Sequence, residues 1–178
     1  MKFKAKIMDE QGVTRAMTRL SYEIVEQCRE LENAVLVGVR TRGVPLAKAI
    51  GENILRFTGV ELPLLELDVA GFRDDAPASA DKRGVLQGET AGKDVILVDD
   101  VLYTGRTARA AIEAVLERGR AKRIRFAVLV DRGHRELPVR ADFVGKNLPT
   151  SRREKVAVKL KETDGETSVC IYEGEESP

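Results

Sequence analysis

Apolar residues recur every three or four positions in the first part of the chain, which is the spacing of one face of an α-helix. This pattern predicts a helix over residues 9–31, with Asp9 available to cap its start. Helices are also predicted over about 44–57, where Pro45 is acceptable in the first turn, and over about 105–118. The positions expected to face the core are Val13, Ala16, Met17, Leu20, Ile24, Cys28 and Leu31 in the first helix and Ala108, Ala111, Ile112, Val115 and Leu116 in the third.

Short runs rich in apolar and β-branched residues alternate with these helices and predict strands. The predicted strands are 34–39, 62–67, 95–98, 124–130, 156–160 and 169–172. Because strands and helices alternate along the chain, the sequence predicts an α/β fold with a central, mostly parallel sheet and helices on both faces. Ligands of such sheets bind beyond the carboxyl ends of the strands, so the segments that follow the strands are the candidate sites.

Three segments lack a sustained period. Residues 69–94 are rich in Gly, Pro, Ser and Asp, and we expect a long mobile loop or β-ribbon flap there, since loops of this length in a compact domain are usually functional or disordered. Residues 131–151 are also expected to form a loop, and the acidic tail 173–178 is expected to fray. The length of 178 residues fits a single domain over 1–178.

The charge of the chain is balanced overall but unevenly distributed. There are 30 Lys and Arg against 29 Asp and Glu, a net charge of +1, which excludes a globally polybasic nucleic-acid coat protein. Residues 118–159, however, carry an excess of 9 positive charges, and residues 161–178 an excess of 5 negative charges. One stretch of the chain can therefore still build a basic face.

The Cys and His residues argue against a zinc site or a disulfide framework. Only Cys28, Cys170 and His134 occur, and no CxxC pair is present. Cys28 lies on the apolar stripe of the first helix and is expected to be a small core residue rather than a reactive one. No apolar run has the length of a signal or membrane segment, so we expect a cytoplasmic protein without a membrane partner.

The window 95–107 carries the clearest candidate chemistry. An apolar strand ends in two adjacent carboxylates, Asp99 and Asp100, and a short loop containing Thr104, Gly105 and Thr107 then opens a helix. The N–H groups at a helix N-terminus bind anions, Gly lets the backbone approach an anion closely, and Thr hydroxyls donate to phosphate oxygens. Carboxylates repel phosphate but accept hydrogen bonds from the vicinal hydroxyls of a ribose. The window therefore predicts a ribose-phosphate site; the alternative is an ordinary strand end with Thr104 as helix cap and solvated acids.

This window resembles the phosphoribosyl pyrophosphate (PRPP) signature of the type I phosphoribosyltransferases, whereas no GxxxxGK[ST] or GxGxxG motif follows a strand. Residues 37–43, VGVRTRG, resemble the pyrophosphate loop of that family. Residues 129–151 resemble the PyrR group, which are pyrimidine operon attenuation regulators and also uracil phosphoribosyltransferases. The resemblance extends over about residues 4–172 and implies the type I phosphoribosyltransferase fold, with a flap or hood over the site.

The resemblance implies that uracil and PRPP react to give UMP and pyrophosphate, with Mg²⁺ carried on PRPP and no direct metal ligand from the protein. Asp99 and Asp100 are expected to hold the ribose hydroxyls, and residues 103–107 the 5-phosphate. Thr41 and Arg42 are expected to bind pyrophosphate, since a guanidinium offers several donors to a phosphate; the alternative for Arg42 is a solvated basic loop. The expected PRPP or nucleotide ligands are Thr41, Arg42, Asp99, Asp100, Val101, Leu102, Tyr103, Thr104, Gly105, Arg106, Thr107 and Arg132, with Asp99, Asp100 and Arg42 assigned to catalysis.

The implied chemistry needs no protein nucleophile. Departure of pyrophosphate builds positive charge on the ribose carbon, so catalysis is expected from stabilisation of the leaving group and exclusion of water. A flap formed by residues 69–94 would exclude water by closing over the site. His134 is expected to be a hydrogen-bonded surface residue rather than a general base, and no proton acceptor is assigned.

The resemblance also implies RNA binding. Proteins of this group, with a uridine nucleotide (UMP or UTP) bound, hold a stem-loop of the leader mRNA and favour transcription termination. The residues that match the RNA face of the family are Thr18, Arg19, Arg135, Arg140 and Lys146, most of them in the basic stretch. Tyr22 and Gln27 depart from the family pattern, in which a His and a basic residue are common. Relatives also imply a homodimer or a larger homo-oligomer.

Two other functions remain open from the residues alone. One is a catalytically idle sensor of UMP or PRPP that acts only through RNA. The other is a salvage phosphoribosyltransferase for uracil or another base, whose basic stretch is a solvated surface or a dimer interface. The intact pair of acids beside TGRT favours an active site over an idle sensor.

Overall fold

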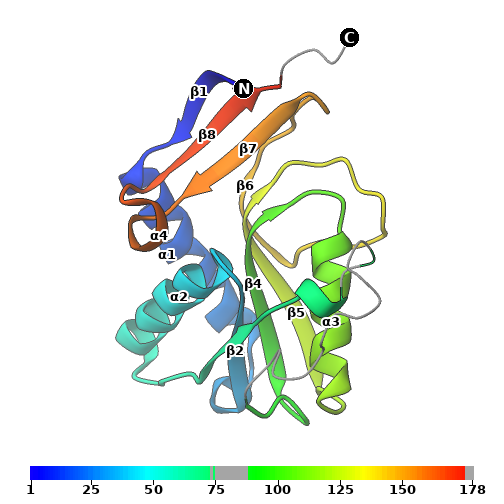
Figure 1. Ribbon diagram of the computed structural model, residues 1–178. Coiled ribbons are helices and arrows are strands. Elements are labelled where there is room, and N and C mark those ends of the chain that lie inside the picture. The colour runs from blue at the N-terminus through cyan, green and yellow to red at the C-terminus, as the bar shows by residue number, and fades with distance from the viewer. Residues whose placement is uncertain (73, 75–87, 175–178) are drawn as a thin grey trace.

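The computed structural model describes residues 1–72, 74 and 88–174. Its centre is a five-stranded sheet in the order β3–β2–β4–β5–β6, in which every neighbouring pair of strands is parallel (Figure 1). The strands are β2 (Ala34–Val39), β3 (Leu64–Leu67), β4 (Asp94–Leu102), β5 (Arg123–Asp131) and β6 (Phe143–Asn147). The expected α/β architecture with a parallel sheet is confirmed.

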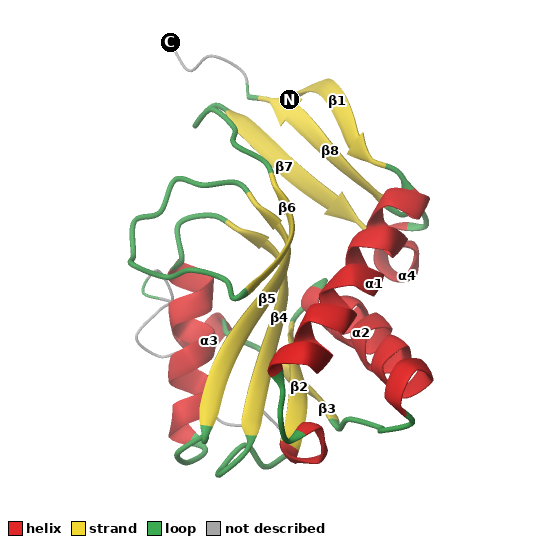
Figure 2. Cartoon of the chain, turned by 180° about the vertical axis from the view of Figure 1, so that it is seen from behind, coloured by secondary structure: helices red, strands yellow, loops and turns green. Residues whose placement is uncertain are grey.

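Helices cover both faces of this sheet, as predicted. Helices α1 (Glu10–Gln27) and α2 (Gly43–Thr58) pack on one face and α3 (Arg106–Glu117) on the other (Figure 2). Successive residues of a strand point to opposite faces, so Leu36 and Ile96 join the core under α1 and α2, whereas Val35 and Val95 join the core under α3. Because both faces are buried, the central strands consist of nearly continuous apolar runs.

The first helix begins as predicted and ends earlier. Asp9 caps it, since its Oδ1 accepts a hydrogen bond of 2.7 Å from the backbone N–H of Gly12. The helix ends at Gln27 rather than at residue 31, because Cys28 has an extended backbone and Leu31–Asn33 form a separate 3₁₀ turn. Cys28 is buried, as expected for a core residue.

The third helix has the predicted bounds within one residue at each end, but one of its predicted core positions is wrong. Leu116 is 50% exposed, whereas Ala110 and Ala114 are buried. At about 100° per residue, position 116 is turned well away from a buried face centred on Ala111 and Val115.

Three strands of the central sheet differ from the prediction by two residues or more. β3 begins at Leu64 rather than at residue 62. β4 extends to Leu102, so Asp99 and Asp100 lie within the strand and not after it. β6 lies inside residues 131–151, which the sequence predicted to be a loop. Its sequence FVGKN has no apolar run, and it is a short edge strand whose pairing with β5, for example Asp131 with Asn147, forms only in the tertiary structure.

A second, antiparallel sheet lies above the carboxyl ends of the central strands (Figure 1). It has the order β1–β8–β7 and brings the N-terminal strand beside the C-terminal one. Its elements are β1 (Lys2–Met8), β7 (Glu154–Lys159), the short helix α4 (Lys161–Asp164) and β8 (Ser168–Glu173). β1 was not among the predicted strands, although KFKAKI alternates Lys with apolar residues as a half-exposed strand does.

The predicted flap over residues 69–94 falls largely outside the described residues, as does most of the predicted frayed tail. In the described part of this segment, Ala70–Phe72 form a 3₁₀ turn and β4 begins at Asp94. No helix in the described part of the chain is long and apolar enough to cross a bilayer.

The start of α2 is packed directly against the backbone of β4. A Cβ atom built on Gly43 would lie 2.3 Å from the carbonyl oxygen of Val98 and 3.3 Å from the Cα of Asp99. Only glycine permits this approach, and it brings residues 40–42 beside the carboxyl end of β4.

Replacement of Gly43 by Ala is therefore expected to lower the free energy of unfolding by about 1–3 kcal/mol, the usual cost of overpacking against a backbone that cannot move aside. Urea denaturation measures this loss. Gly51→Ala in the same helix is the control, because its Cβ would meet only a side-chain atom, Cδ1 of Leu36, at 3.2 Å. Equal stabilities of the two variants would contradict the close approach at Gly43.

Candidate functional site

Two adjacent carboxylates lie at the carboxyl end of the central strand β4. Asp99 is 8% exposed and Asp100 is partly buried. The Oδ1 of Asp99 accepts a hydrogen bond of 2.9 Å from the N–H of Asp100, and the Oδ1 of Asp100 accepts one of 2.8 Å from the N–H of Val101. These local bonds fix both carboxyl groups, and a carboxylate oxygen has further lone pairs for a ligand hydroxyl.

Burial raises the pKa of both carboxyl groups. Loss of solvation is the largest cause for each of them, and for Asp99 the neighbouring charge of Asp100 raises the pKa further. Arg42 acts on Asp100 in the opposite direction, because its positive charge favours the carboxylate. Such a shift, caused by burial and a like charge at the end of a strand, is typical of functional sites.

The segment between β4 and α3 is a short turn, at the position that the sequence predicts to bind a phosphate. Only Tyr103, Thr104 and Gly105 separate the strand from the helix. Gly105 has φ 92°, the left-handed region that favours glycine, and it directly precedes the first helical residue. The carbonyl oxygen of Thr104 accepts hydrogen bonds from the N–H groups of Glu136 (2.9 Å) and Leu137 (3.0 Å). The N-terminal N–H groups of α3, which have no partner inside the helix, are thus held next to the acid pair.

Arg106, a predicted nucleotide ligand, is engaged by acidic side chains. Its Nε donates to Glu136 at 2.8 Å, and its NH1 pairs with Asp74. The backbone N–H of Arg106 lies in the first turn of α3 and donates a long hydrogen bond of 3.4 Å to the hydroxyl oxygen of Thr104.

The predicted pyrophosphate loop lies beside the acid pair, at the carboxyl end of β2. Thr41 is exposed, and Arg40 pairs with Glu66 on the neighbouring strand at 3.0 Å. Arg42 precedes α2 and forms an ion pair with Asp164 of α4 at 2.7 Å. Residues distant in the sequence therefore meet at this edge of the sheet.

Arg132 is buried beside the turn between β4 and α3. It is 6% exposed, and its guanidinium carbon lies 4.0 Å from the centroid of the Tyr103 ring. It donates hydrogen bonds to the hydroxyl of Thr150 at 3.1 Å and to the carbonyl oxygen of Glu154 at 2.6 Å. Arg132 thus fixes the aromatic ring that follows β4 and anchors the start of β7. His134 lies edge-on to the same ring and contacts the carbonyl oxygen of Thr150.

The five residues predicted to face RNA lie around β6, at the edge of the central sheet. Arg19 and Lys146 line a cleft of about 640 Å³ together with Lys6 and Arg15. Thr18 lies on the same helix and is partly buried.

A second cleft of about 480 Å³ also borders β6 and is lined by Arg135 and Arg140. Arg140 is exposed, whereas Arg135 donates to the carbonyl oxygens of Tyr103 (2.7 Å) and Val139 (2.9 Å) and pairs with Asp131. Arg135 thus also fixes the turn between β4 and α3.

Sequence analysis missed Asp164, Glu136 and Thr150, which hold Arg42, Arg106 and Arg132 respectively. No local motif marks these residues. They contact the site only because the loop after β5 and the helix α4 fold back over the carboxyl edge of the sheet.

Asp99→Asn is expected to raise the melting temperature at neutral pH. The pKa of Asp99 in the folded protein lies above its ordinary value of 3.8, so the ionised pair costs stability at any pH above the folded pKa. This cost disappears as the pH falls through that pKa, and the advantage of the variant must shrink toward pH 4. Thermal unfolding between pH 4 and 8 measures the difference in melting temperature between variant and wild type. Each kcal/mol of difference in unfolding free energy shifts the melting temperature by about 2–4 °C. A lower melting temperature of the variant at neutral pH would show that the charge stabilises the fold.

Comparisons with known proteins agree with this geometry. Residues 5–163 match the family model described as "Phosphoribosyl transferase domain". The chain is 53% identical over 168 residues to the "Pyrimidine operon regulatory protein" of Lactococcus lactis strain IL1403, covering 94% of this chain and 96% of that protein. It is 50% identical over 177 residues to the "Bifunctional protein PyrR" of Clostridium perfringens strain SM101, covering 97% of this chain and 99% of that protein.

Solved structures share the fold at low sequence identity. The hypoxanthine phosphoribosyltransferase of Trypanosoma cruzi superposes with a TM-score of 0.74 at 16% identity, covering 97% of this chain and 98% of that one. The parallel sheet with its acid pair at the end of β4 thus occurs in a chain that belongs to the phosphoribosyl transferase family, among the PyrR pyrimidine operon regulatory proteins.

Proposed function

We propose that this protein transfers the phosphoribosyl group of PRPP to uracil, releasing pyrophosphate and forming UMP, and that with a uridine nucleotide bound it holds the leader mRNA of a pyrimidine operon. The observation that carries the proposal is the meeting of the buried acid pair, the N-terminus of α3 and Arg42 at one edge of the sheet. Names of relatives such as "Bifunctional protein PyrR" support both activities.

Each part of this edge suits one part of PRPP. Asp99 and Asp100 accept hydrogen bonds from the 2′- and 3′-hydroxyls of the ribose. The N–H groups at the start of α3, with the hydroxyls of Thr104 and Thr107, donate to the 5-phosphate. Arg42 donates to the pyrophosphate. The ring of Tyr103, held by Arg132, forms a rigid wall on the side of the site where the base would bind.

Catalysis in this proposal is electrostatic. As the bond from the ribose carbon to pyrophosphate breaks, positive charge develops on the ribose and negative charge on the leaving group. The carboxylates lie near the former and the guanidinium of Arg42 near the latter, so both stabilise the transition state more than the ground state.

The acid pair fits a Mg²⁺ ion that PRPP brings with it. The described residues contain no group of three or more His, Cys, Asp or Glu side chains that could hold an ion alone. The two carboxylates would hold the ion through bridging water molecules, which suits an ion that keeps water and substrate oxygens as its direct ligands. When bound, Mg²⁺ would neutralise part of the negative charge of pyrophosphate.

The basic clefts around β6 support the RNA part of the proposal. Lys6, Arg15, Arg19 and Lys146 come from three different elements and concentrate positive charge on one surface. Lysine and arginine at such a surface bind RNA phosphates. A salvage enzyme without an RNA partner remains the competing function, and the binding experiment below separates the two.

Asp99→Asn is expected to lower the rate of UMP formation by at least about 100-fold, because a neutral amide accepts weaker hydrogen bonds from the ribose hydroxyls than a carboxylate and does not stabilise the developing positive charge. Steady-state assays with uracil and PRPP measure the loss. Asp94→Asn, at the opposite end of the same strand, is the matched control and should retain activity. Near-normal turnover in D99N would remove the ribose role of the pair.

Lys146→Ala is expected to weaken the binding of a pyrimidine-operon leader RNA while UMP formation stays unchanged. If Lys146 contacts a phosphate, the logarithm of the RNA association constant should fall less steeply with the logarithm of the salt concentration. The magnitude of this slope should be smaller by about 1 in the variant. Filter binding with and without UMP measures both effects. Lys122→Ala is the control, because Lys122 belongs to the same basic stretch but precedes β5, at the opposite end of the sheet, where it pairs with Glu30. Retention of the RNA that does not depend on UMP, or no retention of the RNA by the wild type, would favour the salvage enzyme.

A further inference from the structure

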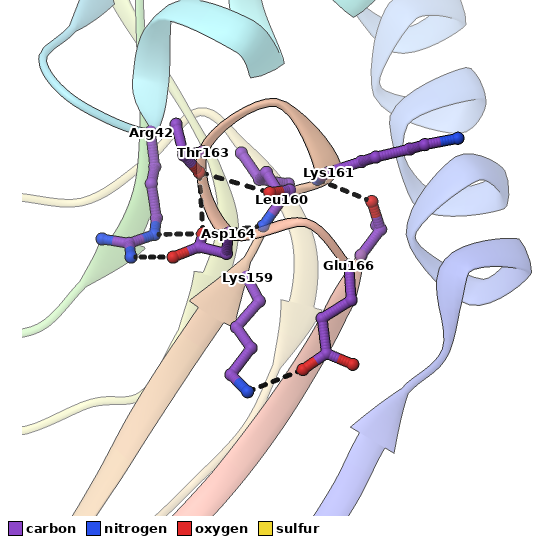
Figure 3. Close-up of polar contacts among 8 residues, drawn as sticks. Arg42, Lys159, Leu160, Lys161, Thr163, Asp164 and Glu166 are labelled. Carbon is purple, nitrogen blue, oxygen red and sulfur yellow. Dashed lines mark hydrogen bonds and ion pairs between the residues drawn. The ribbon is translucent and has the colours of Figure 1, made fainter.

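Arg42 and Asp164 form an ion pair that joins the two sheets of the molecule (Figure 3). Arg42 precedes α2, at the carboxyl end of the central strand β2, whereas Asp164 ends α4, between strands β7 and β8 of the second sheet. The Nε of Arg42 donates to Oδ2 of Asp164 at 3.2 Å, and the NH2 donates to Oδ1 at 2.7 Å. This paired geometry is the one in which a guanidinium and a carboxylate bind with a fixed relative orientation.

The carboxylate of Asp164 is fixed by its own turn as well as by Arg42. Its Oδ2 accepts hydrogen bonds from the N–H of Leu160 at 3.0 Å and from the hydroxyl of Thr163 at 2.7 Å. The hydrogen bond from Arg42, followed by that from Leu160, holds the pKa of Asp164 well below its usual range. Asp164 is therefore a fixed negative group, and its side chain is only 20% exposed.

The ion pair uses one edge of the guanidinium and leaves another edge open. Asp164 occupies the edge formed by Nε and NH2. Among the described residues no hydrogen-bond acceptor contacts NH1 of Arg42. An arginine has five N–H donors, so the edge formed by NH1 and NH2 can still donate two hydrogen bonds to a phosphate group.

We propose that Asp164 is a positioning residue for Arg42, which holds the guanidinium in one orientation so that its open edge binds the pyrophosphate group of PRPP. The inference rests on the proposed function of the site. A free arginine side chain loses conformational freedom when it binds a ligand, and a partner that already orders it reduces that loss. The charge of Asp164 does not oppose pyrophosphate strongly, because Arg42 and two further donors neutralise it. Through this contact the second sheet takes part in binding the leaving group.

The test compares two ligands that differ in the pyrophosphate group. PRPP with Mg²⁺ carries it, whereas UMP shares the ribose and 5-phosphate but has no pyrophosphate. Asp164→Asn keeps the size of the side chain and an acceptor for Leu160 but removes the charge. Calorimetric titration is expected to show PRPP binding weakened about tenfold and UMP binding unchanged. In an Arg42→Ala background, D164N is expected to have no further effect, because Asp164 acts only through Arg42.

Glu166→Gln is the matched control. Glu166 lies on the same connection and pairs with Lys159 at 2.6 Å, without contact to Arg42 (Figure 3). It should leave both affinities unchanged. If D164N fails to fold, Asp164→Ser, which keeps a hydroxyl near Leu160, takes its place.

Three results would overturn the positioning role. Unchanged PRPP affinity in D164N would show that Arg42 needs no partner, and tighter affinity would show that Asp164 competes with pyrophosphate. Equal weakening of PRPP and UMP would show a general structural role. Failure of the wild type to bind PRPP would instead reject the proposed function of the site.

Discussion

The burial of two adjacent carboxylates at the end of β4 is the constraint on which the rest of this site depends. Burial raises the pKa of both Asp99 and Asp100, which means that the protein holds these groups in an environment that disfavours their charge. The apolar residues of β4 supply the compensating free energy, since Ile96, Leu97 and Val98 are almost fully buried between two helical layers. A polar site whose burial costs stability, at the end of a well-packed strand, is a common compromise between stability and function.

Close backbone packing then decides which groups surround the acids. Gly43 allows α2 to begin against Val98 and Asp99, and this contact brings Arg42 to the acid pair. On the other side, the loop after β5 holds the turn that contains Gly105, through hydrogen bonds to the carbonyl oxygens of Tyr103 and Thr104. The turn before α3 and the guanidinium of Arg42 are therefore each held by hydrogen bonds within the protein.

The second sheet is more than a cover for this edge. Arg42 reaches Asp164 from the central sheet, and Arg132 reaches the carbonyl oxygens of Ser151 and Glu154, where β7 begins. Two arginines that follow central strands are thus ordered by backbone and side-chain acceptors of the second sheet. The N- and C-terminal segments of the chain pair as β1 and β8 in this sheet.

Local patterns determined much of this protein. Periodicity located the three main helices, the apolar runs located the inner strands, and the acids beside TGRT marked the candidate site, because helix amphipathicity, strand burial and the turn before a helix each depend on residues close together in the chain. Local patterns did not predict the edge strand β6, the exposure of Leu116 or the continuation of β4 through the acid pair. They also did not predict the partners of Arg42, Arg106 and Arg132. A short polar edge strand has no pattern of its own, and an ion pair such as Arg42 with Asp164 joins residues separated by 122 positions. Only the packing of the two sheets decided those contacts, because the free energy of each depends on which surfaces meet in the folded chain.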